Sequence, residues 1–450
     1  MITLIRNGTV IDPAEGLHAI RDLWINNGTV CSPQAHADEV IDAAGKIVAP
    51  GFLDIHMHED GVDAEGRLES YDERSVFACM LHMGVTTAVA GNCGENKIHP
   101  ADYLDLVDRD GAPVNVAMLA GHGSFRFRAG CDDRYAPSSA DQRSRMAREI
   151  AEALERGCVG VSFGIRYDPG TDAEELVQAA AACRKDGKLI SAHIRDDAAQ
   201  VFSAAREFLD AGLRLEVPLQ VSHIGSMAGF GQMNEFLDLI GGYRRIRPDI
   251  LCDCYPYDAF STQLGSATYD DGWLDRYNCD YSVLELCDPR WRGIPVTEEL
   301  FRRARSEYPR CVTVCHVMRQ DDVDLAYRSD AVMVGSDATL DHGQGHPRAC
   351  GTFPRVLSRY VESGVLTLDD AIRRMTVMPA DQLGLPRKGR LAAGSDADVV
   401  IFDPDTVRDH ATFETPLAPP TGIDRVLIGG KTVLLNGEIL DRRAGRSVRR

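Results

Sequence analysis

Six residues that can bind a metal ion each follow a short apolar run of the sequence. They are His56, His58, Cys93, His193, His223 and Asp337. Imidazole nitrogen, thiolate sulfur and carboxylate oxygen together suit Zn²⁺, which has no geometric preference of its own and accepts mixed ligands. A lone cysteine or histidine is usually a core residue. Six such residues in equivalent positions predict a metal site instead.

The elements that must position these residues are short apolar segments alternating with helical patterns. Nine segments have this character, namely FLDIHMH, TTAVAGNC, PVNVAMLAGH, CVGVSFGI, KLISAHIR, PLQVSHIG, ILCDCYPY, CVTVCHVM and AVMVGSD. Strands that alternate with helices form a parallel sheet, and eight such units close into a TIM-like (β/α)8 barrel with its active site at the carboxyl ends of the strands. The six residues are therefore expected to converge in one pocket. One segment must lie outside the barrel, and CVTVCHVM, after the irregular stretch 259–310, is the best candidate.

The two ends of the chain have a different residue pattern from the middle. Residues 1–51 contain short alternating runs and two Asn-Gly pairs typical of hairpins, and β-like patterns return in residues 389–450. We therefore expect an α/β protein in three parts: a barrel over residues 52–388 and a small β-sandwich built from 1–51 and 389–450.

Composition limits the partners and the compartment. The 450 residues include 49 Lys and Arg against 68 Asp and Glu, a net charge of −19 that disfavours nucleic acid and anionic lipid as partners. The sequence shows neither a signal peptide nor an apolar run of 18 residues, so no membrane association is expected. The 13 cysteines lack regular spacing, which is typical of reduced thiols. These features predict a cytoplasmic protein with a small-molecule substrate, and they leave a homo-oligomer open.

Several motifs carry a family resemblance. PGFLDIHMH, GSD and GRLAAGSDADVVIFD resemble the amidohydrolase superfamily, which joins a metal-dependent barrel to a small β-sandwich. GNCG, GHGSFR, AHIRDD, DCYPY and HGQGHPRACGTFPR are similar to its D-aminoacylase, or N-acyl-D-amino-acid deacylase, branch. The resemblance covers nearly the whole chain and implies hydrolysis of the amide bond of N-acyl-D-amino acids.

The resemblance also implies roles for the metal-binding residues. Cys93, His193 and His223 would hold one tightly bound Zn²⁺, and His56 and His58 would line a second, weaker position. Many superfamily members bridge two metals with a carboxylated lysine, but the corresponding strand here, GVSFGI, has no Lys, and the Cys93 thiolate fits as its substitute. After His223 the sequence departs from the branch: IGSMAGFGQM stands where a second His and a Lys are expected, so the side-chain preference does not transfer.

Catalytic and substrate-binding roles complete the expected site. The resemblance makes Asp337 the general base, and a carboxylate beside a metal-activated water suits the role of proton acceptor and later donor. Arg195, two residues after His193, is expected to face the site and bind a substrate carboxylate, with Arg348 as a further anion contact. Tyr167 and Tyr257 are expected to hydrogen-bond the substrate.

Two alternatives remain at this stage. A cyclic amidohydrolase of the hydantoinase or dihydroorotase kind shares the barrel and the base but usually needs the bridging Lys. A non-catalytic scaffold protein of the same fold would have lost metal ligands, whereas all six positions are filled here. A deaminase is disfavoured because AHIRDD lacks the His-x-Glu spacing.

Overall fold

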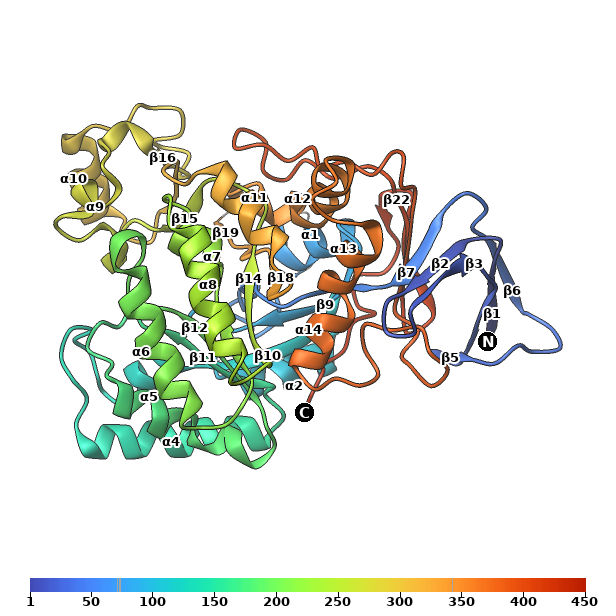
Figure 1. Cartoon of the computed structure of the whole chain (residues 1–450), viewed down its shortest axis with the longest axis horizontal. Coiled ribbons are helices and arrows are strands. Elements are labelled where there is room, and N and C mark those ends of the chain that lie inside the picture. The colour runs from blue at the N-terminus through green and yellow to red at the C-terminus, as the bar shows by residue number, and fades with distance from the viewer. Residues whose placement is uncertain (71, 73, 342) are drawn as a thin grey trace.

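The barrel predicted from the alternating segments is present in the computed structural model, which describes the chain except residues 71, 73 and 342 (Figure 1). Its eight parallel strands follow the order β18-β14-β13-β12-β11-β10-β9-β8. They are β8 (Phe52–Asp54), β9 (Val85–Ala90), β10 (Asn115–Gly121), β11 (Gly160–Gly164), β12 (Leu189–His193), β13 (Leu219–Val221), β14 (Ile250–Cys254) and β18 (Val332–Val334). The segments after β8 and β18 join the two edges, because His58 N donates to Ala338 O (2.9 Å) and Asp337 N donates to His56 O (2.7 Å).

Helices surround the strands, so every residue of these strands is buried, as in sheets covered on both faces. The α-helices are α1 (Val76–His82), α2 (Pro100–Asp110), α3 (His122–Arg128), α4 (Ala140–Glu155), α5 (Ala173–Ala180), α6 (Val201–Leu213), α7 (Ile224–Ala228), α8 (Met233–Arg244), α9 (Trp273–Tyr277), α10 (Glu298–Glu307), α11 (Gln320–Arg328), α12 (Arg348–Arg355), α13 (Leu368–Met375) and α14 (Val377–Gln382). Several begin at a side-chain cap; at α4, Ser139 and Gln142 form a reciprocal capping box.

The ninth segment lies outside the barrel, as predicted. It forms β17 (Val312–Cys315), which pairs antiparallel with β15 (Phe260–Gln263) and β16 (Leu284–Leu286) in a separate three-stranded sheet. This sheet belongs to the long insertion between β14 and β18 that also carries α9 and α10, seen in yellow in Figure 1. A two-stranded hairpin, β19 (Leu340–Asp341) and β20 (Gln344–Gly345), follows β18.

Strands from both ends of the chain meet beside the barrel. A seven-stranded sheet has the order β24-β23-β22-β21-β7-β2-β3. In it, β21 from the C-terminal part of the chain pairs with β7 from the N-terminal part. A four-stranded sheet, β5-β4-β1-β6, packs with it around apolar side chains such as Ile25, Val48 and Leu427. The strands are β1 (Ile2–Arg6), β2 (Thr9–Asp12), β3 (Leu17–Ile20), β4 (Leu23–Asn26), β5 (Thr29–Cys31), β6 (Glu39–Asp42), β7 (Ile47–Pro50), β21 (Val399–Phe402), β22 (Ile423–Ile428), β23 (Lys431–Leu435) and β24 (Glu438–Ile439). The boundaries at 51/52 and 388/389 stay predictions.

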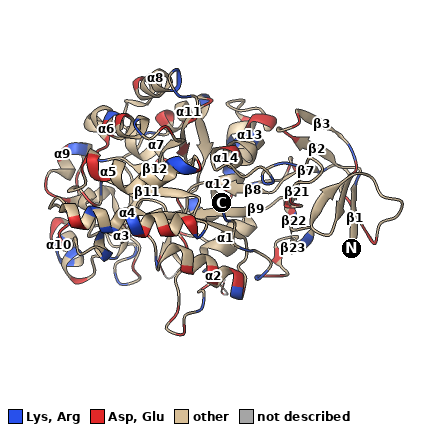
Figure 2. Cartoon of the chain, turned by 90° about the horizontal axis from the view of Figure 1, so that it is seen from below, with Lys and Arg blue, Asp and Glu red and all other residues tan. Residues whose placement is uncertain are grey.

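Acidic and basic residues are interspersed along the helices that surround the barrel (Figure 2). Within the described part of the chain, no helix has both the length and the apolar character needed to span a bilayer.

Candidate metal centre

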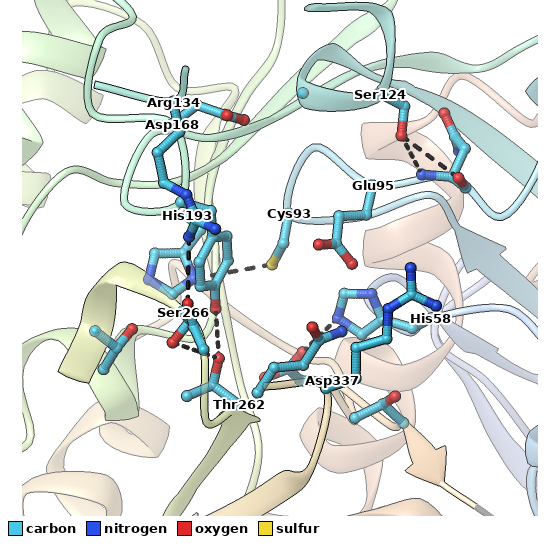
Figure 3. Close-up of a pocket in the computed structure, with 18 of the residues that line it drawn as sticks. His58, Cys93, Glu95, Ser124, Arg134, Asp168, His193, Thr262, Ser266 and Asp337 are labelled. Atoms are coloured by element: carbon cyan, nitrogen blue, oxygen red, sulfur yellow. Dashed lines mark hydrogen bonds and ion pairs between the residues drawn. The ribbon is translucent and has the colours of Figure 1, made fainter. Parts of the chain in front are cut away.

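The six metal-competent residues meet at the carboxyl ends of the barrel strands, where Figure 3 shows four of them around one cavity. Their ligand atoms form two groups in which all atoms lie within 4.8 Å of one another. One group is Cys93, His193 and His223, and the other is His56, His58, Cys93 and Asp337. Cys93 belongs to both groups, so its sulfur is common to the two sets of candidate ligands.

The distances within the cluster are those of donor atoms facing a shared centre. Cys93 Sγ lies 3.4 Å from His56 Nε2, 3.5 Å from His223 Nε2 and 3.9 Å from His193 Nδ1. Asp337 Oδ1 lies 3.1 Å from His58 Nε2 and 3.4 Å from His56 Nε2. A buried cluster of lone-pair donors drawn from five separate strand ends fits a metal ion.

The protonation states of Cys93 and His193 also fit a metal. Burial by itself would raise the pKa of the Cys93 thiol, but the neighbouring His56 and His223 rings outweigh this effect and hold that pKa well below its ordinary value. The thiolate is the form that binds metals. Burial, reinforced by His223, lowers the pKa of His193 to about 4, so its ring is neutral near pH 7 and keeps a lone pair for a ligand bond.

The backbone turns sharply where three of these residues leave their strands. Cys93, His223 and Asp337 have positive φ angles of 53°, 35° and 49°. Non-glycine residues rarely adopt this left-handed conformation, which costs free energy and is concentrated at functional sites. The strain turns the chain at the strand end and aims each side chain across the barrel mouth.

Asp253 holds both metal groups together, and the sequence-based assignment had missed it. It is fully buried one residue before the carboxyl end of β14, where it accepts hydrogen bonds from His56 Nδ1 (3.2 Å) and from the His223 main-chain N–H (2.8 Å). Gln220 Nε2 donates a further bond to it (2.6 Å). A carboxylate on the outer nitrogen of a ligating histidine sets its tautomer and orientation. The available signal was a charged residue inside the otherwise apolar strand ILCDC.

An Asp253→Asn variant is expected to bind metal about 10- to 100-fold more weakly than the parent protein, the usual effect of losing such an outer partner. The neutral amide no longer fixes the His56 ring. Titration of metal-free protein with Zn²⁺ against a chelator measures the change. Asp322→Asn is the matched control, because this buried carboxylate binds the Gly231 N–H and contacts no residue of the cluster. Equal Zn²⁺ affinities in Asp253→Asn and the parent would contradict the assignment.

The cluster lies in a cavity of about 820 Å³, which two of the four expected substrate contacts line. The buried Arg348 guanidinium lies 2.9 Å from Asp337 Oδ2, and its Nε has no hydrogen-bond acceptor among the described residues. The Tyr167 ring meets the His193 ring edge-on at 4.7 Å. Both residues are therefore in place to contact a bound molecule.

The other two expected contacts are placed elsewhere. Arg195 Nε and Nη2 bind the Glu207 carboxylate (2.7 and 2.6 Å), and its Nη1 donates to Pro169 O (2.7 Å). The prediction assumed that β12 continues past His193, but the strand ends there, so the alternation of faces no longer applies. Tyr257 is buried, with its hydroxyl directed at Asp409 (3.5 Å). Neither side chain lines the cavity in the described structure.

A parallel barrel with this donor set at the carboxyl ends of its strands defines a metal-dependent barrel enzyme. The sequence model of the amidohydrolase family matches residues 39–249 and 322–434, and the chain belongs to this family. The resemblance inferred from the motifs is thereby confirmed.

Relatives place the chain in the D-aminoacylase branch. It is 33% identical to an N-acyl-D-glutamate deacylase of Alcaligenes xylosoxydans xylosoxydans, over 99% of this chain and 96% of the relative. It is 31% identical to a D-aminoacylase of the same organism, over 99% and 97%. The structure of an N-acyl-D-glutamate deacylase from Bordetella bronchiseptica, complexed with zinc and a phosphonate mimic of the tetrahedral intermediate, superposes with a TM-score of 0.87 at 30% identity, covering 100% of this chain and 99% of that one.

Proposed function

We propose that the protein hydrolyses the amide bond of N-acyl-D-amino acids to a carboxylate and a free D-amino acid. The observation that carries the proposal is the arrangement of Asp337 between the metal cluster and Arg348: its Oδ1 faces His58 and its Oδ2 faces the guanidinium. Similarity to deacylases over the full chain supports the same reaction class.

The metal we assign is zinc, which Cys93, His193 and His223 would hold tightly. His56 and His58, with the shared Cys93, would form a second, weaker position. When bound, zinc supplies electrophilic chemistry by polarising a carbonyl group and lowering the pKa of water.

Asp337 performs the proton transfers. Burial would raise its pKa, but Arg348 and His56 outweigh this and hold the pKa well below its ordinary value, so the side chain is a carboxylate at neutral pH. It accepts the proton of the attacking water and then delivers it to the nitrogen of the leaving amine. The carboxylate product and the free amine separate after the C–N bond breaks.

Arg348 binds the substrate carboxylate in this proposal, replacing Arg195 in that role. Its guanidinium stacks over the Tyr255 ring at 4.6 Å, which fixes its plane, and its Nε is left for an acceptor. A carboxylate held at Arg348, a carbonyl held at the metal and a side chain in a third direction define the handedness of the α-carbon. Selection of one enantiomer requires three such contacts, and Arg348 and the metal would supply two of them.

The test is a screen of N-acetyl-D- and N-acetyl-L-amino acids for release of free amine. We expect hydrolysis of D-substrates only. We also expect Arg348→Ala to lower kcat/KM by a factor that corresponds to about 2–4 kcal/mol of activation free energy, as for loss of a buried charged partner. Arg195→Ala is the matched control and should retain kcat/KM, because Arg195 is engaged by Glu207.

Equal rates on both enantiomers would contradict the stereochemical assignment. Opening of hydantoin or dihydrouracil without any action on acyl amino acids would identify a cyclic amidohydrolase instead.

A further inference from the structure

The cavity continues well beyond the metal cluster. Its volume of about 820 Å³ lies toward the upper end of pockets that hold drug-sized ligands, so an N-acetyl amino acid fills only part of it. Part of the cavity wall is formed by residues around the start of α2 and by α3 with the residues just after it. Five residues of this part have largely apolar side chains, and we call them the apolar groove: Ile98, Pro100, Phe125, Phe127 and Cys131.

Several neighbouring polar groups of this wall are already bonded within the protein. The Asn96 side chain donates to Leu119 O (3.0 Å) and accepts from the Gly121 N–H (2.7 Å). Ser124 Oγ accepts from the Asn96 N–H (2.8 Å), and Arg128 is paired with Glu149 (3.3 Å). The charged side chains Lys97 and Asp132 that also line the cavity here are exposed to solvent. The five residues of the apolar groove therefore offer hydrocarbon to a bound molecule between polar residues of the same wall, which include His99 and Arg134.

The high exposure of the Phe127 side chain is the unexplained feature of this wall. This side chain is 68% exposed, whereas Phe125, two positions earlier on the same helix, is 1% exposed. Scattered exposed apolar residues need no explanation on a protein surface. Phe127 differs because it lines the same cavity as the metal cluster and as the other four residues of the apolar groove.

The chemistry of the reaction decides which part of the substrate faces the groove. Asp337 must protonate the amine, so the amino acid lies on the side of Asp337 and Arg348. The acyl chain extends from the carbonyl carbon in the opposite direction, toward the loop that follows Cys93. That loop leads directly to the groove, because Gly94 O accepts from the Ser124 N–H (3.0 Å) at the start of α3. Figure 3 shows Glu95 beside Cys93 and Ser124 farther from Asp337.

We propose that the apolar groove binds the hydrocarbon chain of the acyl group, so that the preferred substrates are N-acyl-D-amino acids with an acyl chain longer than acetyl. The inference rests on the proposed deacylase function and adds the class of acyl group. Each methylene buried in the groove adds favourable transfer free energy, and Phe127 covers the outer end of the chain.

The experiment compares kcat/KM for N-acetyl and N-octanoyl derivatives of one D-amino acid. We expect the octanoyl substrate to be favoured at least tenfold, within the range that a few methylenes contribute in an apolar pocket. Phe127→Ser is expected to lower the octanoyl-to-acetyl ratio about tenfold. Ile246→Ser is the matched control: Ile246 is 66% exposed but does not line the cavity, and its variant should keep the parental ratio. Because Phe127 is exposed, thermal unfolding of the variant should match the parent.

The outcomes separate this inference from the function beneath it. Hydrolysis of N-acetyl-D-amino acids without an octanoyl advantage overturns the groove assignment alone. A Phe127→Ser variant that loses both activities equally also overturns it. Absence of hydrolysis with either acyl group on any D-amino acid overturns the deacylase function, and the groove assignment falls with it.

Discussion

Cys93→Ala is expected to lose both the tightly bound metal ion and the catalytic activity. Cys93 is the residue shared by both ligand groups, and its sulfur lies within 3.9 Å of three histidine nitrogens. Alanine removes the thiolate charge that makes the cluster attractive to a cation, and no other thiol belongs to either group among the described residues. Elemental analysis after dialysis, together with kcat on the best D-substrate, measures the two losses in one preparation.

Cys31→Ala is the control for loss of a thiol as such, because Cys31 lies in β5 of the terminal sheets, away from the cavity. It should keep the parental metal content and turnover. Full activity of Cys93→Ala without bound metal would refute the metal-dependent reaction altogether.

Asp337→Asn is expected to keep its bound metal and to lower kcat by about 10² to 10⁴, the span typical of removing a general acid or base. The amide is nearly isosteric, but it can neither accept the proton of water nor return one to the amine. The tight group of Cys93, His193 and His223 does not include Asp337, so this group should still bind its ion. Turnover and metal content of the same sample are the measurements.

The reverse pattern would change the assignment. If Asp337→Asn loses zinc but recovers turnover when metal is added in excess, Asp337 is chiefly a ligand and another group transfers the proton. His58→Asn is a useful companion variant, because His58 faces Asp337 Oδ1 but lies outside the tight group. It should weaken the second metal position while leaving the first.

The sequence alone determined the class of fold and the members of the cluster. Each apolar run had to become a buried strand, and a barrel brings the carboxyl ends of all its strands to one face whatever their separation along the chain. Residues as distant as His56 and Asp337 could thus be assigned to one pocket from their place after a strand. The count of eight strands required one segment to lie outside the barrel, and the irregular stretch 259–310 before CVTVCHVM indicated that this segment was β17.

The tertiary structure decided which side chains beyond the strand ends reach the cavity. Alternation of faces predicts direction only while a strand continues, and it failed at Arg195, where the chain has already left β12. The role of Asp253 depends on two partners that approach from other strands, and the left-handed turns at Cys93, His223 and Asp337 are not visible in a residue pattern. The apolar groove likewise depends on α3 packing beside the loop after Cys93. Such contacts between segments distant in sequence arise only when the barrel closes, so the local periodicity of the sequence cannot predict them.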